Sequence, residues 1–426
     1  MMWAWLRQLV GAPAPAPVPA AKPAAAPAPP LSTQAPAFSR RQPLVERGGA
    51  LAGFYLQLPE SLLLRLGQQA QSPAAVAHHR ALLAAAAPWA AADKVALVCM
   101  PSWMLAREGV ADAVPPHTWL CLDSIDSVAA PVQALLRRRG VLLGVPDSPP
   151  RSQPRVDFVL LQAQASGLDT LILSAQRWSE RLPGVKVVAQ GLAHIEDVEL
   201  ALKGGAHLAC GAFARSATTA ARRELGSTAL RVCELLNHLA LDRDTAVIAD
   251  AVRGDVALAY RLLRYANSPA IGPAQPVQTV DQAVLLLGRG ELYRWLSVQL
   301  LSAADSRQAS RALQETALAR GRLLETVAQQ RGESAAGAFF TLGMLSLIEP
   351  LLQVPLAQAL APLRLSEAVR AALLQREGPL AGYLRLLDAM DTGVGTDIDA
   401  CAAALGIADT LGALNEQAWA WAGGVV

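Results

Sequence analysis

The residues of this chain whose types could do chemistry are few and widely separated. Two histidines adjoin at His78 and His79, and the other candidates include a basic run at Arg137–Arg139 and five cysteines. Adjacent residues on a helix point about 100° apart, so we expect His78 and His79 to be a solvated surface pair and not metal ligands. The cysteines lack CxxC spacing and lie mostly in apolar runs, which predicts buried thiols in a reducing cytoplasm and no zinc site. They are Cys99, Cys121, Cys210, Cys233 and Cys401.

The basic run and the isolated histidines favour structural roles. Arg137–Arg139 stands before Gly140 at the expected end of a helix, where positive charge complements the helix dipole; phosphate binding is the alternative. His117 and His194 each stand alone, and we expect both to be structural.

A second group of candidates lies at the end of the segment DVALAYRLLRYANSP, which begins at Asp255. Asn267 and Ser268 could form a functional pair. We favour a helix end instead, in which Asn267 takes a left-handed cap conformation and Pro269 prevents continuation. Arg264 could bind a phosphate, but it could equally pair with Asp255 or lie in solvent.

The elements that must position these residues fall into three parts. Residues 1–37 are almost entirely Ala and Pro after a short apolar start, which predicts a disordered spacer and no spanning helix. Residues 38–215 open with a hairpin signal around Gly48-Gly49 and continue with short apolar runs that alternate with helical stretches. This alternation predicts a parallel sheet covered by helices, and a β/α barrel with trimmed helices or an imperfect ring is the best match. The expected strands are 42–46, 50–58, 95–100, 119–122, 141–145, 156–161, 170–173, 185–189 and 207–210.

Residues 216–426 are expected to be entirely helical. Asp244 is a predicted N-cap for a helix from Thr245, and Thr279 with Gln282 has the spacing of a capping box. Leu258 and Leu262 belong to an apolar stripe between these two caps. The predicted fold class is therefore a β/α barrel followed by an all-helical bundle.

The first of these domains resembles the EAL family. The resemblance is carried by the order of short segments: QPLV at 42–45, GFYL at 53–56, LDSI at 122–125, GVLLGVPD at 140–147, VDFVL at 156–160, VVAQ at 187–190 and CGAF at 210–213. EAL domains hydrolyse cyclic di-GMP with divalent metals held by carboxylates at strand ends, where the metals activate a water. The positions that correspond to the family's ligands are Tyr55, Val98, Leu120, Pro146, Leu160, Gln190 and Cys210. Asp147 remains of a pair of aspartates, and a shift of one residue would restore only one ligand, Asp123. The resemblance therefore implies a degenerate barrel that does not hydrolyse cyclic di-GMP.

The second domain resembles the HDOD family, helical relatives of the HD phosphohydrolases without their metal-binding His and Asp. The match consists of Asp255, Leu258, Leu262, Asn267-Ser268 and Leu287-Gly288, with a later FFTLGMLS run in which Gly343 would permit close helix packing. His238 is the last histidine of the chain and is followed by Leu239, so the ligands of an HD site are missing. The residues that could carry an interaction or a structural signature are Asp255, Arg264, Asn267, Ser268, Gly288 and Gly343.

Together these features predict a cytoplasmic bacterial signal-transduction protein that is not an enzyme, needs no cofactor or metal and acts through contacts with protein partners. A cyclic dinucleotide is a candidate ligand. The alternatives are a divergent cyclic di-GMP phosphodiesterase and a cyclic di-GMP receptor without turnover. Nucleic acid is not expected as a partner, because a net charge of +2 provides no concentrated basic surface. The basic stretch Arg215–Arg223 is the sole feature that favours it.

Overall fold

The computed structural model describes residues 40–58, 72–147, 155–163, 167–192, 194–211, 224–269, 271–273, 275–303, 310–333, 336–392 and 395–423. The Ala/Pro segment 1–37 and the stretch Arg215–Arg223 lie outside these ranges. The chain divides into two compact units. The barrel unit comprises Met1–Ala217 and Arg385–Gln417, and the helical unit comprises Thr218–Leu384 and Ala418–Val426.

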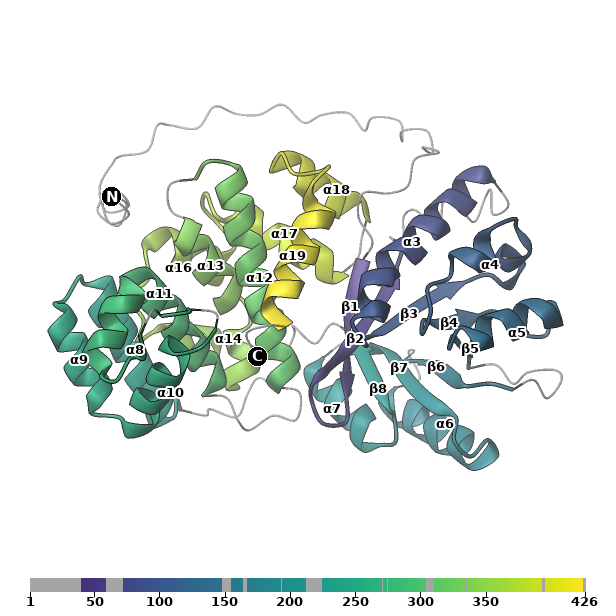
Figure 1. Cartoon of the computed structure of the whole chain (residues 1–426), viewed down its shortest axis with the longest axis horizontal. Helices are drawn as coiled ribbons and strands as arrows, with labels where there is room; N and C mark the ends of the chain where they lie inside the picture. The colour runs from purple at the N-terminus through teal and green to yellow at the C-terminus, as the bar shows by residue number, and fades with distance from the viewer. Residues whose placement is uncertain are drawn as a thin grey trace. The chain divides into compact units, whose positions relative to one another are not determined.

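The barrel unit is built on eight strands that close into a ring in chain order (Figure 1). Strand β1 is antiparallel to both β2 and β8, and the remaining neighbours are parallel. The predicted hairpin and the predicted barrel are therefore confirmed, and the ring is closed. The strands are β1 Arg40–Glu46, β2 Leu51–Gln57, β3 Val95–Met100, β4 Trp119–Leu122, β5 Leu142–Pro146, β6 Phe158–Gln162, β7 Lys186–Leu192 and β8 Leu208–Gly211.

The inside of the ring is packed with side chains from alternate strand positions, because successive residues of a strand point to opposite faces. These side chains form one buried cluster that includes Leu44, Leu97, Phe158 and Val188. Gly144 on β5 leaves room for the Phe158 ring, since a Cβ there would come within 2.4 Å of it. The barrel is thus a filled core and not a pore.

Helices lie on the outer side of the strands (Figure 1). They are α3 Pro73–Ala91, α5 Ala130–Arg138, α6 Leu168–Arg181 and α7 Ile195–Lys203, while the connection from β3 to β4 holds the short η1 Ser102–Ala106 and α4 Val110–Ala113. The predicted strand at 170–173 is wrong, because these residues belong to α6. Leu171, Ala175 and Trp178 are buried at helical spacing, and a short apolar run alone does not separate a strand from a buried helix segment.

The helical unit contains helices of very different length. They are α8 Ser227–Ala240, α9 Thr245–Arg253, α10 Val256–Ala266, α11 Val280–Ser302, α12 Ser310–Gln330, α13 Ala336–Leu345, α14 Ile348–Leu352, α15 Leu356–Leu360 and α16 Glu367–Gln375. The predicted caps are confirmed: Asp244 accepts a hydrogen bond from Ala246 N at 3.1 Å, and Thr279 forms a capping box with Gln282. α17 Ala381–Thr392 and α19 Leu411–Gly423 each cross the boundary between units, and α18 Gly395–Ala404 belongs to the barrel unit.

Candidate functional sites

The carboxyl ends of the parallel strands are where β/α barrels place their active sites. In this barrel Tyr55, Leu160 and Cys210 belong to the inner cluster. Strand alternation from Val188 and Leu142 places Gln190 and Pro146 on the inner face as well. At these positions the inner face carries a phenol, hydrocarbon, a thiol and an amide, and no carboxylate.

The register of two strands differs from the alignment that the sequence suggested. Leu97, Trp119 and Cys121 face inward, so Val98 and Leu120 face outward, toward the surrounding helices. The correspondence of Val98 and Leu120 with inward ligands is therefore wrong by one residue. Cys99, which packs against the inner cluster, and Cys121 take their places. An error of one residue in the alignment is enough to produce this difference, because successive side chains of a strand point to opposite faces.

The two aspartates nearest to this end of the barrel make structural contacts. Asp123 Oδ1 accepts hydrogen bonds from the backbone N–H of Ser102 at 2.7 Å and of Ser124 at 2.9 Å, which ties the loop after β3 to the end of β4. Asp147 Oδ1 accepts a hydrogen bond from the Trp178 indole at 2.8 Å, which holds α6. Among the described residues, no group of three or more His, Cys, Asp or Glu side chains could hold a metal ion.

Three side chains on β2, β3 and β4 form a polar cluster inside the barrel. The Tyr55 hydroxyl donates a hydrogen bond to Cys99 Sγ at 3.2 Å, and Cys99 is the direct register partner of Cys121. The pKa of the Cys99 thiol is lowered, chiefly because the Cys121 thiol donates to it and also because Tyr55 does, although burial opposes both. The pKa of Cys121 is raised, because its proton is shared with Cys99 and because it is buried. We call these three residues the thiol cluster.

Other candidates in the barrel unit turn out to be structural. His78 and His79 are both buried, so the expectation of a solvated pair is wrong. Helix α3 buries a stripe two residues wide that also includes Leu82 and Leu83, and this stripe accommodates adjacent histidines. Arg137 pairs with Asp157 at 3.0 Å and also donates to a backbone carbonyl.

In the helical unit, the end of α10 forms a clamp built around Asn267. Asn267 is the C-cap residue, as predicted, but its φ of −92° is not left-handed, so that detail of the prediction is wrong. Its side-chain amide donates to Val277 O and accepts from Val277 N, both at 2.8 Å, and also donates to Leu263 O. The clamp holds the loop that leads into α11. Ser268 continues the turn through its backbone, and no described residue bonds its buried Oγ.

Asp255 and Arg264 lie at the two ends of the same helix. Asp255 is the N-cap of α10, where its carboxylate accepts a hydrogen bond from Leu258 N at 3.0 Å. Arg264 is exposed, and no ion pair joins it to another described residue, so it does not pair with Asp255. Arg264 therefore lies in solvent, and phosphate binding by this residue stays a prediction.

The two signature glycines have separate structural reasons. Gly288 interrupts α11 with φ 65° and ψ 174°, a conformation open to glycine almost alone, and thereby kinks the helix. Gly343 on α13 faces α12 so closely that a Cβ would lie 2.5 Å from Arg320 O. Gly321 on α12 makes the reciprocal close approach, with a Cβ position 2.9 Å from Phe340 O. The prediction that Gly343 permits close helix packing is confirmed.

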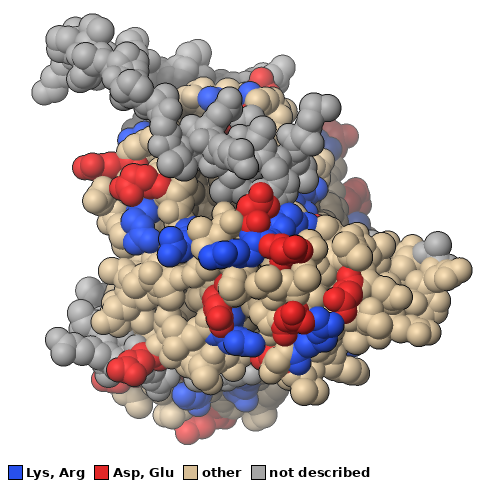
Figure 2. All heavy atoms as spheres, turned by 90° about the vertical axis from the view of Figure 1, so that its left-hand side faces the viewer, with Lys and Arg blue, Asp and Glu red and all other residues tan. Residues whose placement is uncertain are grey.

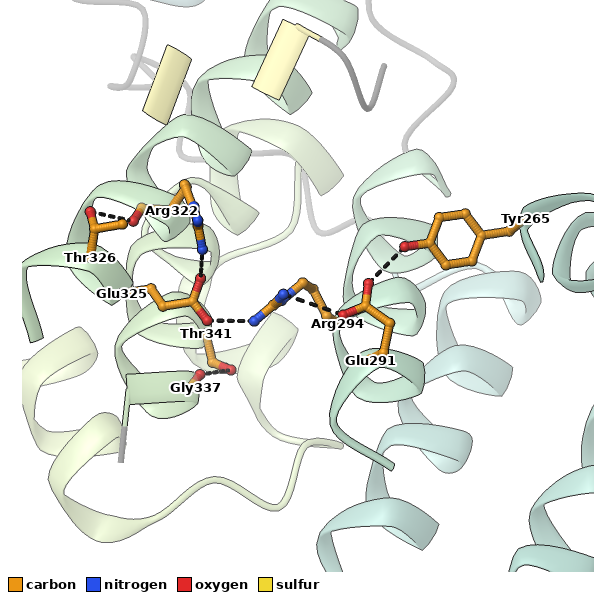
Figure 3. Close-up of polar contacts among 8 residues, drawn as sticks. All are labelled: Tyr265, Glu291, Arg294, Arg322, Glu325, Thr326, Gly337 and Thr341. Atoms are coloured by element: carbon orange, nitrogen blue, oxygen red, sulfur yellow. Dashed lines mark hydrogen bonds and ion pairs between the residues drawn. The ribbon is translucent and has the colours of Figure 1, made fainter. Parts of the chain in front are cut away.

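Between α10, α11 and α12 runs a chain of polar contacts that sequence spacing did not reveal (Figure 3). The Tyr265 hydroxyl donates to Glu291 at 2.7 Å, and Arg294 joins Glu291 to Glu325. Glu325 is only 3% exposed and also binds Arg322, with Nη1 and Oε2 2.8 Å apart. Burial and the contact with Glu291 raise the pKa of Tyr265. We call these five residues the charge relay; its longest links join residues 26 and 31 positions apart, which no local motif indicates.

The face of the molecule that includes α8 to α11 mixes charges of both signs with broad uncharged areas (Figure 2). Arg253 pairs with Asp250 and Asp281, and Arg289 pairs with Asp242. Several large apolar side chains nevertheless remain exposed on these helices, above all Val256 at 83% and Leu285 at 70%. Within the described ranges, no helix has the length and apolarity that a membrane crossing requires.

The fold thus defines a two-part protein in which a closed β/α barrel is followed by an all-helical domain. Residues 224–378 match the family model of the HDOD domain, and this part of the chain is an HDOD domain, as predicted. Two curated proteins are similar in sequence. The uncharacterized protein YuxH of Bacillus subtilis is 25% identical over 214 residues, which cover 49% of this chain and 52% of YuxH. The cyclic di-GMP phosphodiesterase CdgJ of Vibrio cholerae is 30% identical over 136 residues, which cover 32% of this chain and 31% of CdgJ. The chain therefore spans about half of the one relative and a third of the other.

The solved structures that resemble part of the chain include EAL proteins. An EAL domain protein of Listeria monocytogenes has a TM-score of 0.31 at 13% identity, covering 41% of this chain and 85% of that protein. The MucR phosphodiesterase in complex with c-di-GMP has a TM-score of 0.34 at 17% identity, covering 41% of this chain and 92% of that protein. The predicted organisation, a β/α barrel followed by an HDOD domain, is confirmed by the closed ring of strands and by the family match.

Proposed function

We propose that this protein is a cytoplasmic bacterial signal-transduction protein of the EAL–HDOD type that has no catalytic activity and acts through contacts with other proteins. The relative CdgJ, which is 30% identical over 136 residues, is a cyclic di-GMP phosphodiesterase. In this proposal the barrel is retained as a scaffold, and the helical unit supplies the binding surface. Neither part needs a cofactor, and nucleic acid is not a partner.

The observation that carries the proposal is the chemistry of the inner face at the carboxyl end of the barrel. Hydrolysis of a phosphodiester by two divalent metals needs several oxygen ligands, among them carboxylates, because hard cations lose bound water reluctantly and bind anionic oxygens most strongly. Among the described strand residues, the inner positions hold Tyr55, Cys99, Cys121, Pro146, Leu160, Gln190 and Cys210. The nearby Asp123 and Asp147 are already engaged in hydrogen bonds with the protein itself.

Exposed apolar side chains support a role in protein binding. Val256 and Tyr260 lie one turn apart on α10 and are 83% and 65% exposed, and Leu285 is exposed on α11. Large apolar side chains in solvent are the usual centres of protein interfaces when neighbouring polar groups are already paired. The ion pairs of Arg253 with Asp250 and Asp281 are a polar surrounding of this kind.

Incubation of the full-length protein with cyclic di-GMP and Mg²⁺ or Mn²⁺ tests the absence of catalysis. We expect chromatography to detect no linear dinucleotide. The rate of product formation should be at least 10³-fold below that of an active phosphodiesterase assayed in parallel. Turnover that scales with protein concentration, and that disappears when Asp123 and Asp147 are replaced by Asn, would refute the proposal.

A second candidate function is a cyclic di-GMP receptor without turnover. It is favoured by the similarity to CdgJ and by structural neighbours solved with the dinucleotide. Isothermal titration calorimetry separates the two candidates. Saturable binding at micromolar concentration would make the barrel a receptor, whereas no heat above dilution supports the scaffold.

A further inference from the structure

The thiol cluster inside the barrel places two cysteines side by side, which the packing of an apolar core does not require. Cys99 and Cys121 lie on neighbouring parallel strands in direct register, and both side chains face the barrel interior. Neighbouring strands are about 4.8 Å apart, which falls within the Cα separation that a disulfide spans. The two thiols interact closely enough that each shifts the pKa of the other.

The surroundings of the pair distinguish its two members. Tyr55 donates to Cys99, and Cys121 donates to Cys99 as well, so both donors stabilise negative charge on the same sulfur. Cys99 is also the more accessible member, since Cys121 is buried and Cys99 is half-buried. Pro146 and Gln162, at the ends of β5 and β6, are exposed, so this end of the barrel reaches solvent. A half-buried thiol whose negative charge is stabilised, beside a second thiol, is the arrangement of a redox-sensitive cysteine and its resolving partner.

We propose that Cys99 and Cys121 form a reversible disulfide when the protein meets a peroxide, with Cys99 as the attacking thiol and Cys121 as the resolving thiol. The inference is independent of the proposed function, because it concerns oxidation of the chain itself and not binding or hydrolysis of a nucleotide.

The reaction balances in two steps with hydrogen peroxide as the oxidant. The Cys99 thiolate attacks one peroxide oxygen, the O–O bond breaks, and the product is a sulfenic acid with hydroxide leaving as water after it gains a proton. Cys121 then attacks the sulfenic sulfur, the S–O bond breaks, and a second water leaves with the Cys121 proton. Two thiols and one hydrogen peroxide thus give one disulfide and two waters. A small thiol such as glutathione reduces this disulfide again by thiol–disulfide exchange.

The sequence makes the product easy to detect. Trypsin cuts after Lys94, Arg107 and Arg137, so it releases Cys99 in peptide 95–107 and Cys121 in peptide 108–137. The reduced full-length protein is treated with one to five equivalents of hydrogen peroxide, alkylated, digested and analysed by mass spectrometry. We expect peptides 95–107 and 108–137 to appear as one linked species that dithiothreitol separates, while the free thiols fall from five to three.

Three variants make the test specific. Cys121→Ser removes the resolving thiol, so we expect the linked species to vanish and dimedone to trap a sulfenic acid on Cys99. Tyr55→Phe keeps the ring but removes one donor, so we expect Cys99 to react roughly threefold to tenfold more slowly. Cys233→Ser is the matched control, because Cys233 is a buried thiol of the helical unit whose pKa burial raises to about 11, and the linked species should persist.

Absence of the linked species in the wild-type protein would overturn the proposal, as would oxidation of Cys99 no faster than that of Cys233. A phosphodiesterase activity would refute the proposed function but leave this result unchanged, so the two failures can be told apart.

Discussion

The interior of the barrel and the interior of the helical unit are both mainly apolar, but they differ in the polar side chains that they contain. Inside the barrel, β1 to β8 contribute mainly aliphatic, aromatic and thiol groups, and the polar cluster there is neutral when both thiols are protonated. Inside the helical unit, two arginines and two glutamates link α11 to α12, and a tyrosine extends the chain to α10 (Figure 3). Hydrocarbon packing is tolerant of residue exchange, whereas a buried ion pair fixes the relative position of the helices that carry it.

This difference indicates which contacts hold the strands of the barrel and the helices of the helical unit in place. A barrel can lose the carboxylates of an active site and still fold, because its strands are held by backbone hydrogen bonds and its interior by burial. The described residues of the helical unit form no sheet, so its apolar core, its close glycine contacts and the charge relay together fix the helices. These contacts fix the positions of α10 and α11, which carry the exposed apolar side chains. A protein-binding surface needs rigid elements of this kind.

The largest effect is expected from replacing Gly343 by Val. The Cβ would lie 2.5 Å from Arg320 O, a backbone atom that cannot move aside without shifting α12 against α13. We expect the free energy of unfolding of the helical unit to fall by roughly 3 kcal/mol or more, measured by urea denaturation followed by circular dichroism at 222 nm.

Gly337 on the same helix provides the control. A Cβ at Gly337 meets nothing within 4 Å, and alanine is favoured over glycine in a helix by about 1 kcal/mol. Gly337→Ala should therefore be neutral or slightly stabilising. Equal effects of the two substitutions would show that α12 and α13 are not in the close contact described.

A smaller loss of stability is expected from Glu325→Ala. The change leaves Arg294 and Arg322 without their shared carboxylate, and both arginines are partly exposed and can gain some hydration. We expect a loss of about 2 kcal/mol, below the usual cost of breaking a fully buried pair, in the same urea experiment.

Glu234→Ala removes an exposed glutamate that pairs with Arg231 in the same unit. Exposed pairs of this kind contribute roughly 0.5 kcal/mol or less, so this variant should unfold close to the wild-type midpoint. A Glu325→Ala protein as stable as Glu234→Ala would mean that the charge relay does not hold the helices together.

Much of this architecture could be predicted from local sequence. The strands β3 and β4 have the limits that their apolar runs indicated, and the caps at Asp244 and Thr279 were visible as short motifs. The apolar run inside α6 was misassigned, because its burial on one helical face depends on the strands beneath it.

The parts that could not be predicted depend on contacts between distant segments. The inward or outward direction of Val98 and Leu120 follows from the closure of the ring, which a single strand does not encode. Arg294, which pairs with Glu325, and Tyr55, which bonds Cys99, come from other elements of their units. His78 and His79 were misassigned for a related reason, since only the packing of α3 against strands on one broad face shows that both are buried.

The smallest expected effect concerns the neutral histidines of the barrel unit and its dependence on pH. Burial lowers the pKa of His79 below its usual value of 6.5, although a hydrogen bond to Ala75 O partly opposes this. The pKa of His207 is lowered by burial and by Arg47 and Lys186, and its Nδ1 accepts a hydrogen bond from Val187 N, so protonation there would break that bond. The folded state therefore favours the neutral form of both rings.

Because their folded pKa values lie below the unfolded value, both histidines stabilise the fold fully above pH 6.5, and this contribution is lost as the pH falls below it. Between pH 7.5 and 5.5 we expect His79 to account for most of the resulting loss of stability, and His207, which is partly exposed and screened, for less. In the double variant His79→Asn/His207→Asn an amide can replace each ring hydrogen bond without titrating. Its thermal midpoint should then vary less with pH than that of the wild type. An unchanged pH dependence would show that groups other than these two histidines control the acid sensitivity of the barrel unit.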